Sequence, residues 1–474
     1  MNDDEIADLS LNTVAACIAD GRLTSREVTR VCLDRIATLG RQHRSVVRCE
    51  PGAALAAAER ADEELAAGRL RGPLHGVPLA HKDMFYRQGQ VSACGSRILA
   101  DYRPDHTAHV LKRLDLAGAL DIARLNMTEF ATGAPVYGHN PITGTPRNPW
   151  NTDHGTGGSS SGPASAVAAR LIYGALASDT GGSIRVPASC CGVVGIMPTY
   201  GRVSRYGAMP LSTSWDHVGA MTRTVKDSAL MLGVIAGHDS NDPASNTSPV
   251  PDYVSDIEDG AKGVRIAVSE DYFYDQVDDE VRRHLDTSLA SLRTAGADIV
   301  HIRLPESLDE ALETHRIVFQ FEAAQYHQKW INDRPDDYTA WTRQRLAPGL
   351  DIPAERYAEA LEQRERLLAE FSATVFDQAD MLHAPVVPTP VPTIAESDPD
   401  TRDDYLELSA RVSHTTRPVN AFHLPALSLP AGLDHNRVPV GFQLIGRPDD
   451  EATLFRVGRA YECESGWQTF GPPI

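Results

Sequence analysis

Hydrophobic and polar residues alternate with two different periods along the first part of the chain. Residues 24–40 and 53–67 have helical spacing, and Thr24-Ser25-Arg26-Glu27 forms a capping box ahead of the first of these helices. The short apolar run from Gly76 to Asp83 predicts a strand that ends near Lys82. Residues 108–117 predict a helix and residues 120–123 a further strand. This alternation predicts an α/β layered fold.

Similar patterns continue beyond a polar, acidic stretch at residues 238–263, which we interpret as a surface linker across the domain. We expect strands over 264–268 and 438–445, and helices over 279–295 and 352–379. The Pro-rich residues 385–392 are expected to be extended backbone that enters a cleft. A chain of 474 residues can form one large α/β domain or two to three smaller ones, so length leaves the domain count open.

Charge, cysteine content and the lack of long apolar runs limit the partners, the cross-links and the location that we expect. The net charge of −19 would repel phosphates, so we expect neither nucleic acid nor a membrane as a partner. Seven cysteines without C-x-x-C spacing predict no disulfide framework and no structural zinc site. The acidic N-terminus lacks the features of a signal peptide, and no apolar run approaches the roughly 20 residues of a membrane span. We therefore expect a cytoplasmic protein.

Two serines, Ser159 and Ser183, each follow a Gly-Gly pair on either side of an apolar run. We expect a buried helix from Pro163 to about Ala175 between them. Gly-rich turns at both ends of such a helix can bring the two hydroxyls together as a nucleophile and its proton relay. Successive N–H groups in the second turn, residues 179–183, can converge as an oxyanion hole.

Lys82 is one of only five lysines, against 40 arginines. Lysine can lose its proton and act as a base, which arginine effectively cannot. Burial after an apolar strand would lower the pKa of Lys82 from about 10.4 to roughly 7–8, at a cost of about 3–4 kcal/mol. A lysine like Lys82, taken alone, is more often exposed or ion-paired than catalytic. Each of the two serines, taken alone, is more often a turn or helix-cap residue. Only the combination of Lys82 with both serines is specific for a catalytic site. The sequence contains no P-loop and no G-x-S-x-G elbow that would indicate a different chemistry.

The motifs together resemble the amidase signature family. They are GVPLAHKDMF around Lys82, RNPWN at 147–151, the signature at 157–198, and the segments 199–227, 417–432 and 438–446. The resemblance implies one α/β/α domain over residues 1–474 with a large mixed β-sheet flanked by helices. Its parts would be N-terminal helices (1–70), a catalytic core (71–237), the linker (238–263) and the rest of the sheet with the substrate pocket (264–474).

The resemblance also implies roles for individual residues. Ser183 would be the nucleophile, Ser159 the proton relay after a cis peptide bond, and Lys82 the base. The oxyanion would be held by backbone N–H groups of Thr180, Gly181, Gly182 and Ser183. Ser160, Asp179 and Arg185 would support this network. Neither a metal nor an organic cofactor is implied.

The pocket walls are expected from two segments. Residues 126–137 would line the acyl side by resemblance, with Gly133, Ala134 and Tyr137 against the substrate. Residues 200–216 carry Tyr206, Met209 and Trp215, which suit a small aryl or alkyl group. Core packing of these three side chains remains an equal alternative.

The resemblance favours a stand-alone serine hydrolase that cleaves carbon–nitrogen bonds through an acyl-enzyme. Its substrates would be small aryl or alkyl amides, anilides or carbamates (a urethanase-type activity), with esters possible. Only this small-molecule substrate is expected as a partner, and the protein would be a monomer or homodimer. The alternative is the glutamine-hydrolysing subunit of a tRNA-dependent amidotransferase, but residues 314–345 do not resemble the Tyr-rich segment expected there. Intact Lys82, Ser159 and Ser183 disfavour a third possibility, a catalytically silent binding protein.

Overall fold

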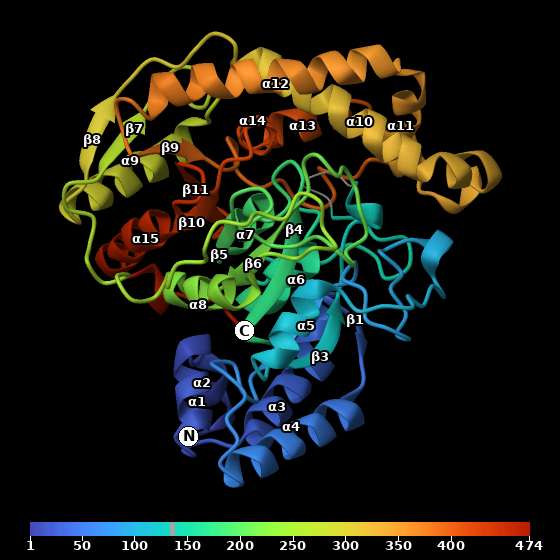
Figure 1. The fold of residues 1–474 in the computed structure, drawn as a ribbon, viewed down its shortest axis with the longest axis vertical. Helices are drawn as coiled ribbons and strands as arrows, with labels where there is room; N and C mark the ends of the chain where they lie inside the picture. The colour runs from blue at the N-terminus through green and yellow to red at the C-terminus, as the bar shows by residue number, and fades with distance from the viewer. Residues whose placement is uncertain (133–137) are drawn as a thin grey trace.

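A computed structural model describes residues 1–132 and 138–474. Its described strands form one eleven-stranded sheet with the order β1-β3-β2-β4-β6-β5-β10-β11-β9-β7-β8 (Figure 1). Both parallel and antiparallel pairs occur, so the sheet is mixed. The strands are β1 (Val46–Cys49), β2 (Pro78–Lys82), β3 (Leu120–Leu125), β4 (Gly174–Asp179), β5 (Val194–Met197), β6 (His217–Thr222), β7 (Arg265–Val268), β8 (Asp298–His301), β9 (Met381–Pro385), β10 (Ala426–Leu433) and β11 (Pro439–Gly446).

Strand β10 shows how helices cover both faces of this sheet. Successive side chains of a strand point to opposite faces. Leu427 and Leu429 lie close to Gly458 of helix α15 (Glu451–Ser465), whereas the Ser428 hydroxyl donates to the carbonyl of Arg185 in helix α7 (Arg185–Cys191). Helices α8 (Val225–Ile235) and α9 (Asp279–Thr294) pack with α15, and α6 (Ser161–Ala168) packs with α7. The sheet is therefore the middle layer of an α/β/α arrangement, which confirms the predicted fold class.

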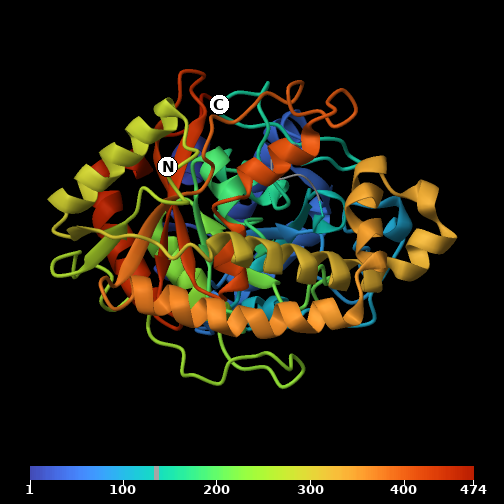
Figure 2. The ribbon, with the colours of Figure 1, turned by 90° about the horizontal axis from the view of Figure 1, so that it is seen from above.

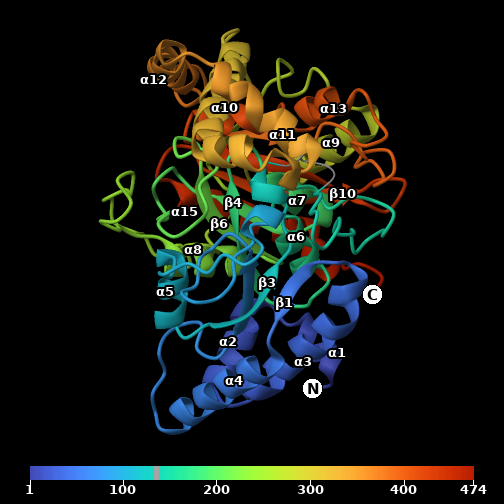
Figure 3. The same cartoon turned by 90° about the vertical axis from the view of Figure 1, so that its right-hand side faces the viewer.

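Further helices lie at the two ends of the molecule. At the N-terminal end are α1 (Asp3–Asp8), α2 (Leu11–Ala19), α3 (Ser25–Arg35) and α4 (Pro51–Ala66), with α5 (His109–Leu116) closer to the sheet (Figures 1 and 3). At the opposite end, α10 (Leu308–Asp333) and α12 (Ala354–Val375) pack against each other, as Figure 2 shows from above. Three short helices complete this end: α11 (Ala340–Leu346), α13 (Tyr405–Val412) and α14 (Arg417–Ala421).

Most predicted elements are confirmed, but the helix between the two serine turns is shorter than expected. The Thr24 capping box is present, with Glu27 as its partner. Helix α6 ends at Ala168, and residues 174 and 175 already belong to strand β4. An apolar run does not distinguish a buried helix from a buried strand, and this run contains both. The single-domain division stays a prediction, although one sheet unites strands from residue 46 to residue 446.

Candidate active site

The candidate site lies where two neighbouring parallel strands end. Strand β2 ends at Lys82 and strand β4 at Asp179, and the pairing of His81 with Leu176 brings Lys82 beside Ser178. Both strands are buried along their whole length. Polar side chains at the carboxyl ends of such strands are therefore held in place by a packed sheet.

Lys82 contacts two hydroxyls and no carboxylate among the described residues. Its Nζ donates to Ser159 Oγ and to Ser178 Oγ, both at 2.8 Å. Burial lowers the pKa of Lys82 to about 7, although the charges of Asp179 and Asp216 act in the opposite direction. A large fraction of the amine is therefore neutral near pH 7, where its lone pair can accept a proton from a hydroxyl.

The turns carrying Ser159 and Ser183 meet at the same place. The Gly158–Ser159 peptide bond is cis, as the family resemblance implied. Directly after it, the N–H of Ser160 donates to the carbonyl of Ser183 at 3.3 Å, and the Ser160 hydroxyl donates to the carbonyl of Ser178 at 3.2 Å. Ser183 is partly exposed, whereas Ser159 and Lys82 are buried. The structure thus brings the three expected catalytic residues together, with the expected nucleophile nearest to solvent.

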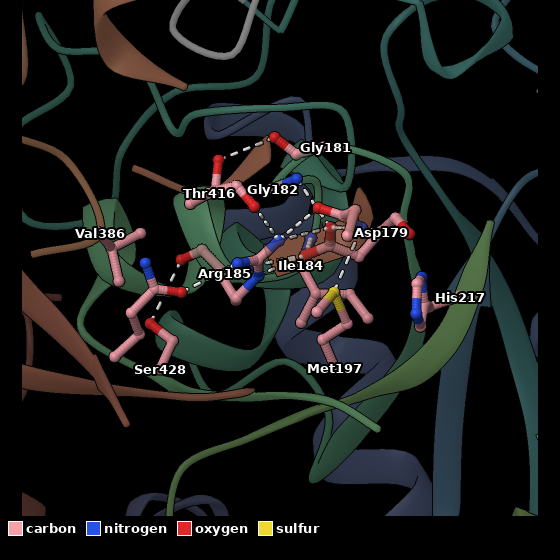
Figure 4. Close-up of polar contacts among 12 residues, drawn as sticks. Asp179, Gly181, Gly182, Ile184, Arg185, Met197, His217, Val386, Thr416 and Ser428 are labelled. Atoms are coloured by element: carbon pink, nitrogen blue, oxygen red, sulfur yellow. Dashed lines mark hydrogen bonds and ion pairs between the residues drawn. The ribbon is translucent and has the colours of Figure 1, made fainter. Parts of the chain in front are cut away.

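Asp179 and Arg185 form a fully buried ion pair beside the turn that carries Ser183, residues 179–183 (Figure 4). The Asp179 carboxylate accepts from the N–H groups of Gly182 and Ile184 at 2.7 and 3.0 Å and from the Arg185 guanidinium at 3.1 Å. Burial alone would raise the pKa of Asp179, but Arg185 and these hydrogen bonds lower it overall. The carboxylate therefore stays charged and fixes the shape of the turn.

The Arg185 guanidinium connects this turn to the C-terminal part of the chain. It donates to Gln443 Oε1, Asn420 Oδ1 and the carbonyl of Thr416 at 2.8, 2.6 and 3.0 Å.

An Arg185→Leu variant would leave Asp179 buried without its counter-charge, so we expect it to lower the free energy of unfolding by about 3–5 kcal/mol. Urea unfolding followed by circular dichroism measures this change. Arg22→Leu, which removes an exposed pair with Asp20, should change it by about 1 kcal/mol at most. A similar small change for Arg185→Leu would contradict the structural role of the pair.

The expected oxyanion hole is altered by one contact. The N–H of Gly182 points to the Asp179 carboxylate, so it is already engaged. Among the hydrogen bonds of the described residues, the N–H groups of Thr180, Gly181 and Ser183 have no acceptor and are available for a ligand. The Thr180 hydroxyl donates to Asp216 at 2.6 Å, and His315 Nε2 donates to the Thr180 carbonyl at 2.7 Å. These two side chains hold Thr180 from both sides.

The structure separates the residues expected to bind substrate. Ser183 opens into a hollow that is also lined by Ala131, Leu211, His315, Phe319, Arg345, Ser413 and Arg417. Tyr206 and Met209 line a different hollow, on the side of Ser178 and Met84. Trp215 lines neither one, which corrects its predicted contact with substrate. It is fully buried, its indole N–H donates to the carbonyl of His315, and its ring stacks on that histidine. Gly133, Ala134 and Tyr137 lie outside the described residues.

Sequence reasoning missed four residues around the site. Ser178 contacts Lys82, His315 holds Thr180, and Arg345 and Arg417 line the hollow beside Ser183. Arg417 belongs to a motif that carried the family resemblance, but nothing in its spacing points to Ser183. His315 and Arg345 lie more than 100 residues after Ser183 in the sequence, and no local motif marks them.

Within the described part of the chain, no group of three or more His, Cys, Asp or Glu side chains could hold a metal ion. The same part contains no helix suited to crossing a membrane.

Comparison with known proteins relates this geometry to a family. The family model described as Amidase matches residues 27–455. A glutamyl-tRNA(Gln) amidotransferase subunit from Chloroflexus aggregans is 37% identical over 492 positions that cover 99% of each chain. The solved structure of the corresponding subunit from Thermotoga maritima has a TM-score of 0.78 at 30% identity, covering 98% of this chain and 94% of that one. A structure from a vestigial protein complex linked to the origins of an s-triazine catabolic enzyme has a TM-score of 0.89 at 30% identity, covering 97% and 99%.

These relatives correct two expectations from the sequence. The stand-alone hydrolase of small amides, anilides or carbamates is wrong as the main function, because full-length relatives at 35–38% identity are amidotransferase subunits. The same relatives overturn the expectation of a small-molecule partner alone, without nucleic acid, for a monomer or homodimer. A net charge of −19 describes the whole surface, so it does not exclude RNA that is held through partner subunits.

The match extends over most of the chain and includes the segments that carry Lys82, Ser159 and Ser183. The chain belongs to the amidase family and is an enzyme of the kind that acts on carbon–nitrogen bonds.

Proposed function

We propose that this chain is the glutamine-hydrolysing subunit of a tRNA-dependent amidotransferase, and that Ser183 releases ammonia from the amide. The observation that supports amide hydrolysis is the contact of a buried lysine, whose pKa is lowered to about 7, with the hydroxyl of Ser159. The full-length similarity to amidotransferase subunits supports the assignment of glutamine as the ammonia donor.

The proposed reaction begins with a proton transfer along the three residues. Neutral Lys82 accepts the Ser159 proton as Ser159 takes the proton of Ser183, and Ser183 Oγ attacks the amide carbon. The N–H groups of Thr180, Gly181 and Ser183 would hold the resulting oxyanion. Ser159 then gives a proton to the amide nitrogen and regains one from protonated Lys82, the carbon–nitrogen bond breaks, and ammonia leaves an acyl-enzyme with Lys82 neutral again.

Water completes the cycle through the same groups. Ser159 and Lys82 take a proton from a water molecule as it attacks the acyl carbon. Collapse of the second oxyanion breaks the ester bond to Ser183 Oγ, which regains its proton, and releases the carboxylic acid. Each turnover thus converts one amide and one water into one acid and one ammonia.

The role within an amidotransferase implies partners for this chain. The relatives are named for an enzyme that acts on glutamyl-tRNA(Gln). We assign the tRNA-bound substrate to partner subunits, because this chain carries a net charge of −19. A cytoplasmic location, where aminoacylated tRNA serves protein synthesis, is part of this proposal.

Ammonia release from glutamine tests the proposal. We expect the purified chain with the other amidotransferase subunits of its own organism to release ammonia from glutamine and to form glutaminyl-tRNA(Gln). We expect much less ammonia from the chain alone. Failure to release ammonia from glutamine under both conditions, with rapid turnover of a neutral anilide by the chain alone, would overturn the assignment.

A further inference from the structure

Asp216 lies opposite Thr180, beside the candidate site. Strands β4 and β6 pair antiparallel with Asp179 against His217, so the residue after Asp179 faces the residue before His217. The Thr180 hydroxyl donates to Asp216 Oδ1 at 2.6 Å, and both side chains are buried. A buried carboxylate therefore holds one of the residues whose N–H group is available for the oxyanion.

The same carboxylate also holds one wall of the hollow that contains Ser183. Asp216 Oδ2 accepts from the N–H groups of Leu211 and Ser212 at 2.9 and 3.1 Å. Leu211 lines that hollow together with Ser183. One oxygen of Asp216 therefore closes the segment 211–216 on itself, and the other oxygen holds the turn that carries Ser183.

Asp216 is charged under the conditions in which the proposed base is neutral. Burial raises the pKa of Asp216 to about 6, although the Thr180 hydroxyl and the N–H groups of the segment act in the opposite direction. At pH 8 this carboxylate is therefore ionised, and its hydrogen bonds are of the stronger, charge-assisted kind. Lys82, whose pKa is lowered to about 7, is largely neutral at the same pH.

The turn that carries Ser183 does not fix the direction of the Thr180 N–H by itself. Two glycines follow Thr180 directly, and glycine restricts the backbone less than any other residue. Asp179 holds the second half of the turn, whereas Asp216 and His315 hold the first half at Thr180. Oxyanion donors are effective when they are fixed before the reaction, and a shift of about 1 Å can cost about 100-fold in rate.

We propose that Asp216 is a positioning residue for the reaction at Ser183, which aims the N–H of Thr180 at the oxyanion and fixes Leu211 beside it. The inference rests on the proposed attack by Ser183, but not on glutamine as the amide that is attacked. An oxyanion forms only after the attack has begun, so loss of this alignment lowers kcat and leaves KM nearly unchanged. A role in folding alone would instead lower the free energy of unfolding and leave the kcat of folded molecules unchanged.

Asp216→Asn tests the role of the carboxylate with little change of shape. We expect kcat for ammonia release at pH 8 to fall about 10- to 100-fold, with KM within about threefold of the parent. Glutamine and pentanamide are both measured, with the chain and its partner subunits. Loss of the Asp216 charge can only lower the pKa of Lys82, so the proposed base stays neutral at this pH in the variant as well.

Glu322→Gln is the matched control, because Glu322 of helix α10 holds the same segment without a hydrogen bond to Thr180. The Glu322 carboxylate accepts from the hydroxyls of Ser212 and Ser214 at 2.6 and 2.5 Å and from the N–H of Ser214 at 3.0 Å. We expect this variant to keep kcat within about threefold of the parent. An equal loss of kcat in Glu322→Gln and Asp216→Asn would overturn the positioning role.

Variants of Thr180 test the same contact from its other side, and they decide the matter if circular dichroism shows that Asp216→Asn does not fold. Thr180→Val removes the hydroxyl and should lower kcat about as much as Asp216→Asn. Thr180→Ser keeps a hydroxyl and should be at least about tenfold more active than Thr180→Val. The double variant Thr180→Val/Asp216→Asn should be no less active than Asp216→Asn, because both residues act through one contact. Losses that multiply in the double variant, or equal activity of Thr180→Val and Thr180→Ser, would overturn the inference.

The two amides separate this inference from the proposed function. If the parent hydrolyses pentanamide but not glutamine, the amidotransferase assignment fails and the Asp216 variant is judged on pentanamide. Parental kcat for Asp216→Asn on each amide that the parent hydrolyses would overturn the positioning role while hydrolysis at Ser183 stands. Ammonia release from neither amide would overturn both.

Discussion

A Ser183→Ala variant is expected to lose ammonia release from its amide substrate by about 10⁴-fold or more in kcat. The hydroxyl supplies the oxygen that would attack the amide carbon, and Ser159 is buried behind it and does not replace it. Removal of one oxygen atom should leave the fold unchanged, because the Ser183 hydroxyl makes no hydrogen bond with the described residues. Steady-state ammonia release by parent and variant measures the loss.

Ser255→Ala, at an exposed serine of the polar stretch, is the control and should keep parental activity. Circular dichroism spectra of both variants should match that of the parent. Near-parental turnover by Ser183→Ala would exclude Ser183 as the nucleophile. If parental turnover were instead lost only in Ser159→Ala, the roles of the two serines would have to be exchanged.

A Lys82→Met variant is expected to lower kcat by about 10³-fold or more. Methionine fills a similar buried volume but cannot accept the proton that Lys82 Nζ would take from Ser159, 2.8 Å away. The double variant Lys82→Met/Ser183→Ala should be no less active than Ser183→Ala, because residues of one proton relay act as a unit. Lys112→Met, at an exposed lysine, is the matched control. Additive losses in the double variant would show that Lys82 acts independently of Ser183.

The same lysine predicts the pH dependence of the parent enzyme. Its pKa is lowered to about 7, so the amine is charged below this pH and neutral above it. Only the neutral form can accept a proton, so kcat/KM should rise from about pH 6 and level off near pH 8. The rising limb should be absent from the residual activity of Lys82→Met. A flat profile for the parent over this range would contradict a titrating base.

Local patterns predicted most of the fold because each element has its own signal. Thr24 and Glu27 define the start of helix α3, and the buried strand β2 ends at Lys82 as its apolar run suggests. The boundary between helix α6 and strand β4 could not be predicted in the same way, since both are fully buried and rich in small apolar residues. The order of the strands is also absent from local sequence, because β10 lies beside β5 through contacts more than 200 residues apart.

The candidate site around Lys82, Ser159 and Ser183 could be located from the sequence because the family motifs surround it. Lys82, Ser159 and Ser183 carry conspicuous neighbours such as paired glycines. The substrate pocket was not accessible, because His315, Arg345 and Arg417 reach it only through packing of α10, α11 and α14 over the sheet. Tyr206 and Met209, which the sequence analysis expects to contact substrate, line a different hollow from the one that contains Ser183. Aromatic or apolar character does not indicate on which side of a buried lysine a side chain lies.

The hydrogen bonds of Arg185 have a consequence for protein synthesis. The turn that shapes Ser183 depends on Thr416, Asn420 and Gln443, which the ribosome adds more than 200 residues later. A nascent polypeptide in which Ser183 has already emerged therefore lacks three groups that hold this turn until residues 416–443 have been translated and have docked. The proposed ammonia release would in this way require a chain that has been translated beyond Gln443.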